Sequence, residues 1–252
     1  MCIRDSSKSM LAEDIAPSRM NKSKQLVGQV INNLGGDRIG IVAYAGKAFP
    51  QLPLTTDYSS AKMFLQNMNT DMLSSQGTAI DEAIRLSSTY FDQDQSTERL
   101  LFIVSDGEDH NDVSYDMADL AAKNNVTIYS VGVGTEKGSP IPIKKNGIVM
   151  SYKKDINGEV VITKLNKIYL ENISDKTGGK FIDGTVTDDV IKEVVKILEN
   201  TEKKEFDTQK FSGFEDQFQW FILIGFILII IDIFMRDGKT IWLKNLNLFN
   251  EK

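Results

Sequence analysis

Five oxygen-bearing side chains from three separated segments have the types and the spacing of a metal site. The first segment, residues 5–9, reads D-x-S-x-S; the second is Gly77-Thr78, and the third is Ser105-Asp106-Gly107. Two carboxylates and three hydroxyls are hard oxygen ligands, which suit Mg²⁺ or Mn²⁺ and leave some water on the ion. Zinc and EF-hand calcium fit poorly, because no thiol, imidazole or dense group of carboxylates accompanies them. The candidate ligands are Asp5, Ser7, Ser9, Thr78 and Asp106.

Each segment also has an ordinary structural explanation. Ser and Asp are common at turns and helix ends, Thr78 can cap the helix that follows it, and Asp106 before a glycine can end a strand in a turn. The combination favours a site, because ligands of open α/β sheets gather at the carboxyl ends of strands. Asp106 follows a strand-like run, and Asp5 would follow another.

Alternating strand and helix patterns predict the scaffold that would bring these segments together. Buried strands are expected at 37–46, 99–107 and 126–135, with a short strand at 180–184 and a proline-bearing edge or hairpin segment at 48–55. Helices are expected at 17–34, 57–68, 78–91, 113–124, 165–176 and 187–203. We therefore predict an α/β fold, a Rossmann-like, doubly wound and mostly parallel sheet with helices on both sides.

Two parts of the predicted domain, residues 1–203, depart from this alternation. Residues 136–165 contain Asn146-Gly147 and Asn157-Gly158, which are strong signals for tight hairpin turns. We expect them to form a small β meander, a hairpin insertion in the α/β domain. At the other end, only Met1-Cys2-Ile3-Arg4 precedes Asp5, so we expect the first strand to be largely missing.

A strongly apolar run near the C-terminus predicts a transmembrane helix at 218–235. Its about 18 residues would span roughly 27 Å as a helix, enough for a hydrocarbon core. Trp220 and Arg236 have the positions of interface anchors. A buried core helix is the alternative, but the run is apolar on every face, which favours a span. Residues 204–217 would then be a linker and 236–252 a tail.

Bulk composition disfavours several functions. The 252 residues carry a net charge of −6, which disfavours a nucleic-acid partner, and Cys2 is the only cysteine, which excludes an intrachain disulfide. A Ser-His-Asp hydrolase would need His110, the only histidine, and no G-x-S-x-G elbow is present. A haloacid dehalogenase phosphatase needs a carboxylate where Ser7 stands, and no phosphate-binding loop occurs. We therefore expect a protein that is not an enzyme.

The five candidate ligands match, in order and rough spacing, the metal-ion-dependent adhesion site (MIDAS) of von Willebrand factor A (VWA) domains. The chain resembles that family over about residues 5–200, although the family usually has an apolar residue at the position of Ser6 and a full strand before it. In the family, the first Asp and the serines hold Mg²⁺, and one coordination position is left for a carboxylate of a partner protein. The resemblance therefore implies adhesion rather than turnover.

Longer runs resemble the Bat proteins, VWA-domain membrane proteins of the aerotolerance type. These runs are SKSMLAEDIAPSRM, DRIGIVAYAGKAFPQLPLTTD, SQGTAIDEAI and SDGEDH, and the tail EFDTQKFSGFEDQFQWF is most similar to the BatB branch. The resemblance implies a bacterial inner-membrane protein whose domain faces the periplasm and whose tail is cytoplasmic. It also implies partners among other Bat-type proteins and a MoxR-type AAA+ ATPase. A metal-independent membrane scaffold with a degenerate MIDAS is the alternative.

Overall fold

The computed structural model describes residues 1–70, 72, 79–91, 97–108, 113–212, 222–223 and 225–228. The chain divides into two compact units, Met1–Phe206 and Asp207–Lys252. The first unit contains the central sheet and the described candidate ligands, so the fold and the site presented below belong to it.

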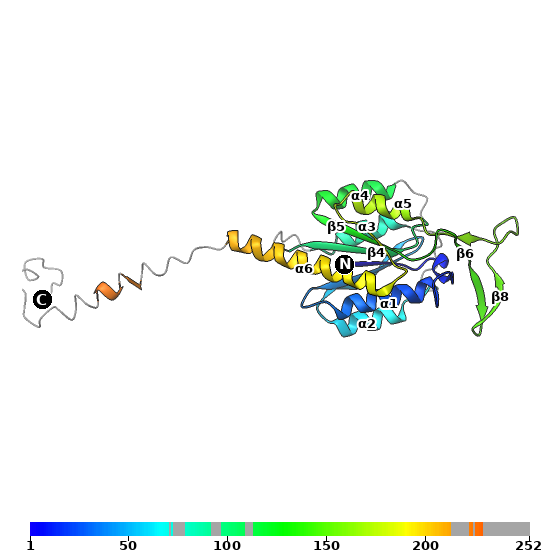
Figure 1. Cartoon of the computed structure of the whole chain (residues 1–252), viewed down its shortest axis with the longest axis horizontal. Coiled ribbons are helices and arrows are strands. Elements are labelled where there is room, and N and C mark those ends of the chain that lie inside the picture. Colours follow the sequence, from blue (N-terminus) through cyan, green and yellow to red (C-terminus); the bar gives the residue numbers. More distant parts are fainter. Residues whose placement is uncertain are drawn as a thin grey trace, which may run out of the picture. The chain divides into compact units, whose positions relative to one another are not determined.

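Six strands form the central sheet in the order β10-β5-β4-β1-β2-β3 (Figure 1). All neighbours pair in parallel except β3, which runs antiparallel to β2 at one edge. Pro50 and Pro53 lie in β3. Because β3 is an edge strand, the backbone N–H groups that proline lacks are not needed for hydrogen bonds inside the sheet. The predicted mostly parallel α/β sheet is therefore confirmed. The strands are β1 (Cys2–Asp5), β2 (Ile39–Tyr44), β3 (Ala48–Thr55), β4 (Arg99–Ser105), β5 (Val126–Gly132) and β10 (Phe181–Asp183).

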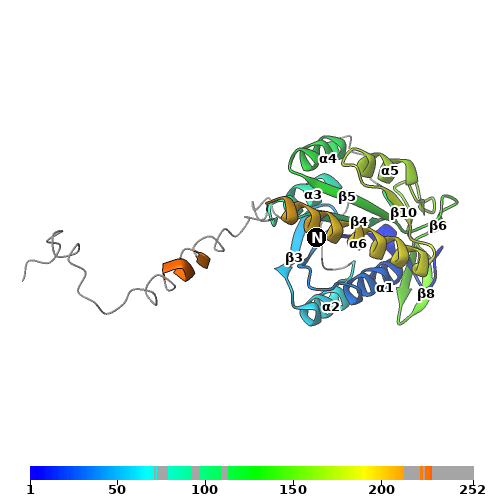
Figure 2. The same cartoon turned by 60° about the vertical axis from the view of Figure 1, so that its left-hand side comes forward.

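Helices cover both faces of the sheet, as Figures 1 and 2 show. Helices α1, α2 and α6 bury apolar side chains such as Leu26 and Val194 against one face. Helices α3, α4 and α5 bury others, such as Ile84 and Ile173, against the opposite face. The helices are α1 (Arg19–Asn32), α2 (Tyr58–Asn67), α3 (Ile80–Ser88), α4 (Val113–Lys123), α5 (Lys167–Asp175) and α6 (Thr187–Ser212).

The first strand, which we expected to be largely missing, is present over four residues at the centre of the sheet. Its residues are all buried, and Cys2 pairs with Ile41 of β2 and with Phe102 of β4. The amino group of Met1 donates a hydrogen bond to the Leu100 carbonyl oxygen at 2.9 Å. This short strand places Asp5 at the carboxyl edge of the sheet.

Residues 136–165 form two small two-stranded sheets instead of the single meander that we predicted. Strand β6 (Ser139–Pro140) pairs with β9 (Ile162–Thr163), and β7 (Pro142–Lys145) pairs with β8 (Ile148–Tyr152). Asn146 and Gly147 have φ values of 52° and 80°, as a two-residue hairpin turn requires. At Asn157-Gly158 the chain also turns, but only the isolated bridge between Lys154 and Val160 follows, so the meander is not continuous.

Helix α6 continues through residues 204–212, which we expected to belong to a linker. Its sequence holds neither Gly nor Pro before Gly213, so nothing in it ends the helix earlier. The predicted span at 218–235 lies largely outside the described residues, of which 222–223 and 225–228 are helical. Within the part of the chain that the structure describes, no helix is both long and apolar enough to cross a membrane.

Candidate metal centre

Two neighbouring parallel strands carry two candidate carboxylates to the same edge of the sheet. Asp5 is the last residue of β1, and Asp106 directly follows β4, whose register with β1 pairs Val104 with Arg4. Both carboxylates are fully buried, with 0% of each residue exposed. The structure thus brings together two segments that lie about one hundred residues apart in the sequence, as parallel neighbours in an α/β sheet allow.

The loop after β1 places both candidate serines beside Asp5. The backbone N–H of Ser7 donates to Asp5 Oδ1 at 2.8 Å, and the chain then enters the 3-10 helix η1 (Lys8–Leu11), which contains Ser9. The hydroxyl oxygens of Ser7 and Ser9 lie 2.7 Å apart, and both residues are buried. The D-x-S-x-S spacing therefore folds into a compact group of oxygen atoms.

Hydroxyl groups of two neighbouring strands fix Asp5 from the other side. Ser105, at the end of β4, donates to Asp5 Oδ2 at 2.7 Å, and Tyr44, at the end of β2, donates to the same atom at 3.2 Å. Ser105 Oγ also accepts the backbone N–H of Gly107 at 2.9 Å. Gly107 has a φ of +70°, and a Cβ there would lie 2.9 Å from the Asn166 carbonyl oxygen, so this turn requires glycine.

Asp106 accepts hydrogen bonds from a buried cation and a backbone amide. Its Oδ2 lies 2.8 Å from Nη1 of Arg19 in an ion pair whose side chains are both 0% exposed. The Glu108 N–H donates to Oδ1 at 3.2 Å. A carboxylate offers about four lone-pair sites, so these two donors leave room for a further ligand.

The guanidinium of Arg19 connects the centre to the insertion. Its Nε and Nη2 each donate to Asp14 at 2.8 Å, while Nη1 donates to the Thr163 hydroxyl at 2.9 Å and Nη2 to the Thr163 carbonyl oxygen at 3.0 Å. Asp14 in turn accepts the backbone N–H of Thr135 at 2.8 Å. A displacement of Asp106 would therefore act through Arg19 on β9, which contains Thr163.

Asp5 and Asp106 are two carboxylates that lie close enough together in a buried site to act on each other. Burial, followed by the charge of Asp5, raises the pKa of Asp106, and the charge of Arg19 opposes this rise. Burial likewise raises the pKa of Asp5, against the hydrogen bonds that it accepts. Arg19 is already shared between Asp106 and Asp14. A divalent cation beside Asp5 and Asp106 would offset the repulsion between these two carboxylates.

The chemistry of the donors also fits a hard divalent cation. Asp5, Asp106, Ser7 and Ser9 offer only oxygen, the donor that Mg²⁺ and Mn²⁺ prefer. Among the described residues, no group of three or more His, Cys, Asp or Glu side chains is placed to hold a metal. The centre thus depends on hydroxyls as well as carboxylates, and these four residues would hold the ion.

Thr78, the fifth predicted ligand, lies outside the described residues, as does His110. The next described residue, Ala79, donates its backbone N–H to the Ala45 carbonyl oxygen at 2.7 Å. Ala45 directly follows β2, a parallel neighbour of β1. Ala79 and the start of α3 therefore lie at the same edge of the sheet as Asp5.

Four further residues that contact the carboxylates or one another were not predicted from the sequence: Arg19, Tyr44, Ser105 and Thr163. Tyr44 and Ser105 end strands next to β1, and this strand-end position is a signal that could have pointed to them. Arg19 and Thr163 meet across 144 residues of sequence, and neither belongs to a pattern that predicts the contact.

Known proteins are similar to this chain in sequence and in fold. Residues 1–108 match the family model of the von Willebrand factor type A domain. The crystal structure of BatB from Bacteroides thetaiotaomicron is 34% identical to this chain and has a TM-score of 0.76; the match covers 80% of this chain and 97% of that one. This chain belongs to the von Willebrand factor type A family. More closely, it is a VWA protein of the Bat type.

A second Bat-type structure agrees with this assignment. It is described as an aerotolerance-related membrane protein from Bacteroides fragilis, and it is 32% identical with a TM-score of 0.75 over 79% of this chain and 98% of that one. The chain spans less than two thirds of the curated relatives that it matches. It is 26% identical to an uncharacterized Borreliella burgdorferi protein over 239 residues, which are 91% of this chain and 66% of that protein.

More distant structures share only the fold of the VWA domain. One is the proximal thread matrix protein 1 of the mussel byssus, described with a zinc-occupied MIDAS motif. It is 17% identical, with a TM-score of 0.56 over 78% of this chain and 44% of that one.

Proposed function

We propose that this VWA domain binds a protein partner through a divalent cation, Mg²⁺ or Mn²⁺, held at the carboxyl edge of its sheet. Asp5, Ser7, Ser9 and Asp106 would hold the ion, with Thr78 as the fifth ligand. One observation carries the proposal: two buried carboxylates and two hydroxyls converge where Arg19, the cation paired with Asp106, is already shared with Asp14.

The residues of the centre have distinct tasks in this proposal. The bound ion would supply a coordination position for a carboxylate of the partner. Asp5 and Asp106 contribute charge, while Ser7 and Ser9 contribute neutral oxygen. Ser105 and Tyr44 keep Asp5 oriented through the hydrogen bonds that they donate to Oδ2. The proposal gives none of these residues a role in proton transfer or in attack on a substrate, so the proposed activity is adhesion and not catalysis.

The proposed cellular setting rests on the Bat-type relatives. One of them is described as a membrane protein, and the apolar run at 218–235 would anchor this chain in the bacterial inner membrane. In our proposal the VWA domain faces the periplasm and works with other Bat-type proteins and a MoxR-type AAA+ ATPase in stress tolerance. The zinc-bearing MIDAS of the byssus protein supports a divalent ion in this fold.

A metal-independent membrane scaffold is the main alternative. It would keep the fold and the anchor but would use the two carboxylates only in the network around Arg19. The ion pair between Arg19 and Asp106 is the observation that favours this alternative, because it provides one carboxylate with a counter-charge without any metal.

Calorimetric titration of the full chain with Mg²⁺, and separately with Mn²⁺, tests the proposal. Asp106→Asn keeps the shape of the side chain and removes its charge. Asp183→Asn is the matched control, because Asp183 also ends a parallel strand but is exposed. We expect saturable binding in the unchanged protein and in Asp183→Asn, and a loss of at least about tenfold in affinity in Asp106→Asn.

Two results would contradict the proposal. One is the absence of saturable binding of either ion to a chain that is folded by circular dichroism. The other is equal affinity in Asp106→Asn and Asp183→Asn, which would place the ion elsewhere. Either result would favour the scaffold alternative.

A further inference from the structure

The hairpin formed by β7 and β8, residues 142–152 and here called the arm, stands out from the α/β body at the edge of the sheet that carries the metal centre (Figure 1). Every residue of β8 is exposed, and β7 is the only strand that pairs with β8 in the described part of the chain. The outer edge of β8 therefore presents backbone N–H and C=O groups that no described strand takes up.

Large apolar side chains line the arm although nothing in the described domain covers them. Ile148 and Met150 are each 67% exposed, and Tyr152 is 44% exposed. The pairing of β7 with β8 shifts register between Ile143 and Lys144, so a bulge at Met150 interrupts the alternation and the exposed apolar side chains lie on both faces of the hairpin. Exposed apolar surface of this kind marks a place where another molecule binds.

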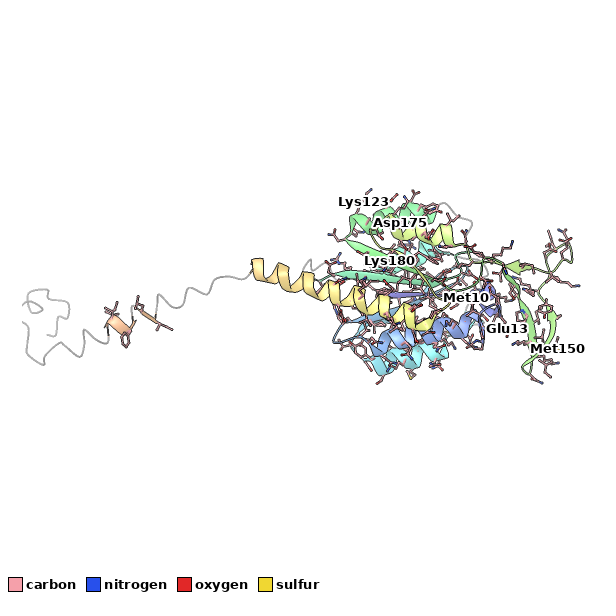
Figure 3. The ribbon with its side chains drawn as sticks, in the orientation of Figure 1. Met10, Glu13, Lys123, Met150, Asp175 and Lys180 are labelled. Carbon is pink, nitrogen blue, oxygen red and sulfur yellow. The ribbon has the colours of Figure 1, made fainter. Side chains whose placement is uncertain are left out.

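Two contacts tie the arm and its base to the metal centre. Lys144 of β7 forms an ion pair with Glu13, which lies four residues after Ser9. Thr163, on the strand that closes the insertion, bonds to Arg19, which also bonds to Asp106. Figure 3 shows Glu13 beside the arm and Met150 within it. The insertion that carries the arm is therefore connected to the candidate metal centre through Glu13 and Arg19.

The charge of the insertion differs in sign from that of the whole chain. Residues 136–165 contain six lysines and three acidic residues, whereas the chain has a net charge of −6. Lys145, Lys153 and Lys154 form no ion pair within the described residues. A partner that is acidic as well as apolar would complement this surface.

We propose that the arm is the second half of the partner-binding surface, and that the partner presents an acidic, extended segment that adds a strand to the outer edge of β8. The proposal rests on the metal-dependent adhesion proposed above: one carboxylate of the same partner would bind the ion, while its apolar side chains cover Ile148 and Met150. Backbone pairing would give affinity, and the alternate side chains would give specificity.

The structure favours this occupant over a second copy of the chain and over a lipid surface. Two copies paired through their arms would bring the unpaired lysines of the insertion, Lys145, Lys153 and Lys154, close to those of the other copy, and this repulsion opposes pairing of copies. Helix α6 begins beyond β10, at the carboxyl edge of the sheet, where Lys22 bonds to Thr187, and runs toward the opposite edge (Figure 2). It therefore leads the chain away from the arm within the domain, which does not favour a second membrane contact there.

Binding of a model peptide to the full chain tests this inference. The probe is a fluorescent peptide that alternates valine and glutamate, with matched peptides in which lysine or threonine replaces glutamate, measured by anisotropy in Mg²⁺. The arm variant is Ile148→Ser with Met150→Ser. The control is Ile168→Ser, because Ile168 of α5 is 70% exposed and lies outside the arm. We expect the glutamate peptide to bind the unchanged chain more tightly than the lysine and threonine peptides do. We expect its affinity to fall by about tenfold or more in the arm variant and to stay unchanged in Ile168→Ser.

The Mg²⁺ titration described above is repeated on both variants, so that failure of the arm is distinguished from failure of the metal centre. Unchanged Mg²⁺ binding together with equal peptide affinity in the arm variant and the control would overturn the arm proposal and leave the metal proposal standing. No binding of the glutamate peptide to a chain that binds Mg²⁺ would also overturn it. Arm-dependent binding to phosphatidylglycerol vesicles in place of the peptide, or arm-dependent dimerisation, would replace the partner with a bilayer or a second copy.

Discussion

At the centre of the sheet, Arg4 contributes a buried charge without a full set of partners. It pairs through its backbone with Ala43 and Val104, and its side chain is 0% exposed. Its Nε donates to the Ser23 hydroxyl at 3.1 Å, but Nη1 and Nη2 have no hydrogen-bond partner in the described part of the chain. Burial lowers the pKa of Arg4 to about 10. The charged form is therefore disfavoured by folding.

We predict that Arg4→Met stabilises the domain, raising its free energy of unfolding by about 1–3 kcal/mol in urea titrations. The change removes an unsatisfied cation, and Ser23 keeps the bond that its hydroxyl donates to the Met20 carbonyl oxygen. Arg85→Met, at a side chain 63% exposed, is the control and should change stability by less than about 0.5 kcal/mol. A destabilised Arg4→Met would mean that the guanidinium has a stabilising partner.

Ser105 joins the two loops that carry the buried carboxylates, since its hydroxyl donates to Asp5 and accepts from the Gly107 N–H. We predict that Ser105→Ala weakens Mg²⁺ binding by about tenfold, because groups that orient ligands typically contribute this much. Calorimetry would measure the change beside Ser130→Ala, a buried serine on β5 that bonds to Ser174 instead. Equal affinities in the two variants would show that Asp5 is oriented without Ser105.

At the scale of elements, the sequence predicts most of the domain because period and turn chemistry are local. Buried strands such as β4 contain continuous apolar runs, and the Asn146-Gly147 turn adopts the left-handed φ values that its residue types permit. The predicted meander is not continuous, because residues 153–161 form only an isolated bridge beside their turn. A turn signal in the sequence does not determine how the flanking residues pair. The contact of Arg19 with Thr163 depends on packing between distant segments, so no local pattern predicts it.

The bond from Arg19 to Thr163 also gives a test of how firmly the insertion is attached to the domain. We predict that Thr163→Val lowers the free energy of unfolding by about 1–2 kcal/mol. Valine has nearly the shape of threonine, but it has no hydroxyl to accept the hydrogen bond that Nη1 of the buried Arg19 donates. Backbone amides of β6 and β9 should then exchange faster with deuterium than in Thr127→Val, a control on β5 outside this network. Unchanged exchange in Thr163→Val would mean that the Thr163 carbonyl oxygen alone holds the strand in place.

At the scale of the whole molecule, the single cysteine makes the proposed membrane topology accessible to labelling. Cys2 is only 5% exposed, and burial raises its pKa to about 11, so its thiolate is scarce in the folded domain. New cysteines at chosen positions would therefore react against a low background. Lys154 is exposed in the insertion, and Asn250 belongs to the tail that the sequence predicts to be cytoplasmic.

We predict that a membrane-impermeant maleimide labels Lys154→Cys in intact bacteria, and labels Asn250→Cys only after the inner membrane is permeabilised. The expected physical reason is that the apolar run at 218–235 separates the two positions by a bilayer. The unchanged chain is the control and should stay unlabelled until it is unfolded in urea, which exposes Cys2. Labelling of Asn250→Cys alone would place the VWA domain in the cytoplasm, and labelling of both positions in intact cells would show that the run does not span the membrane.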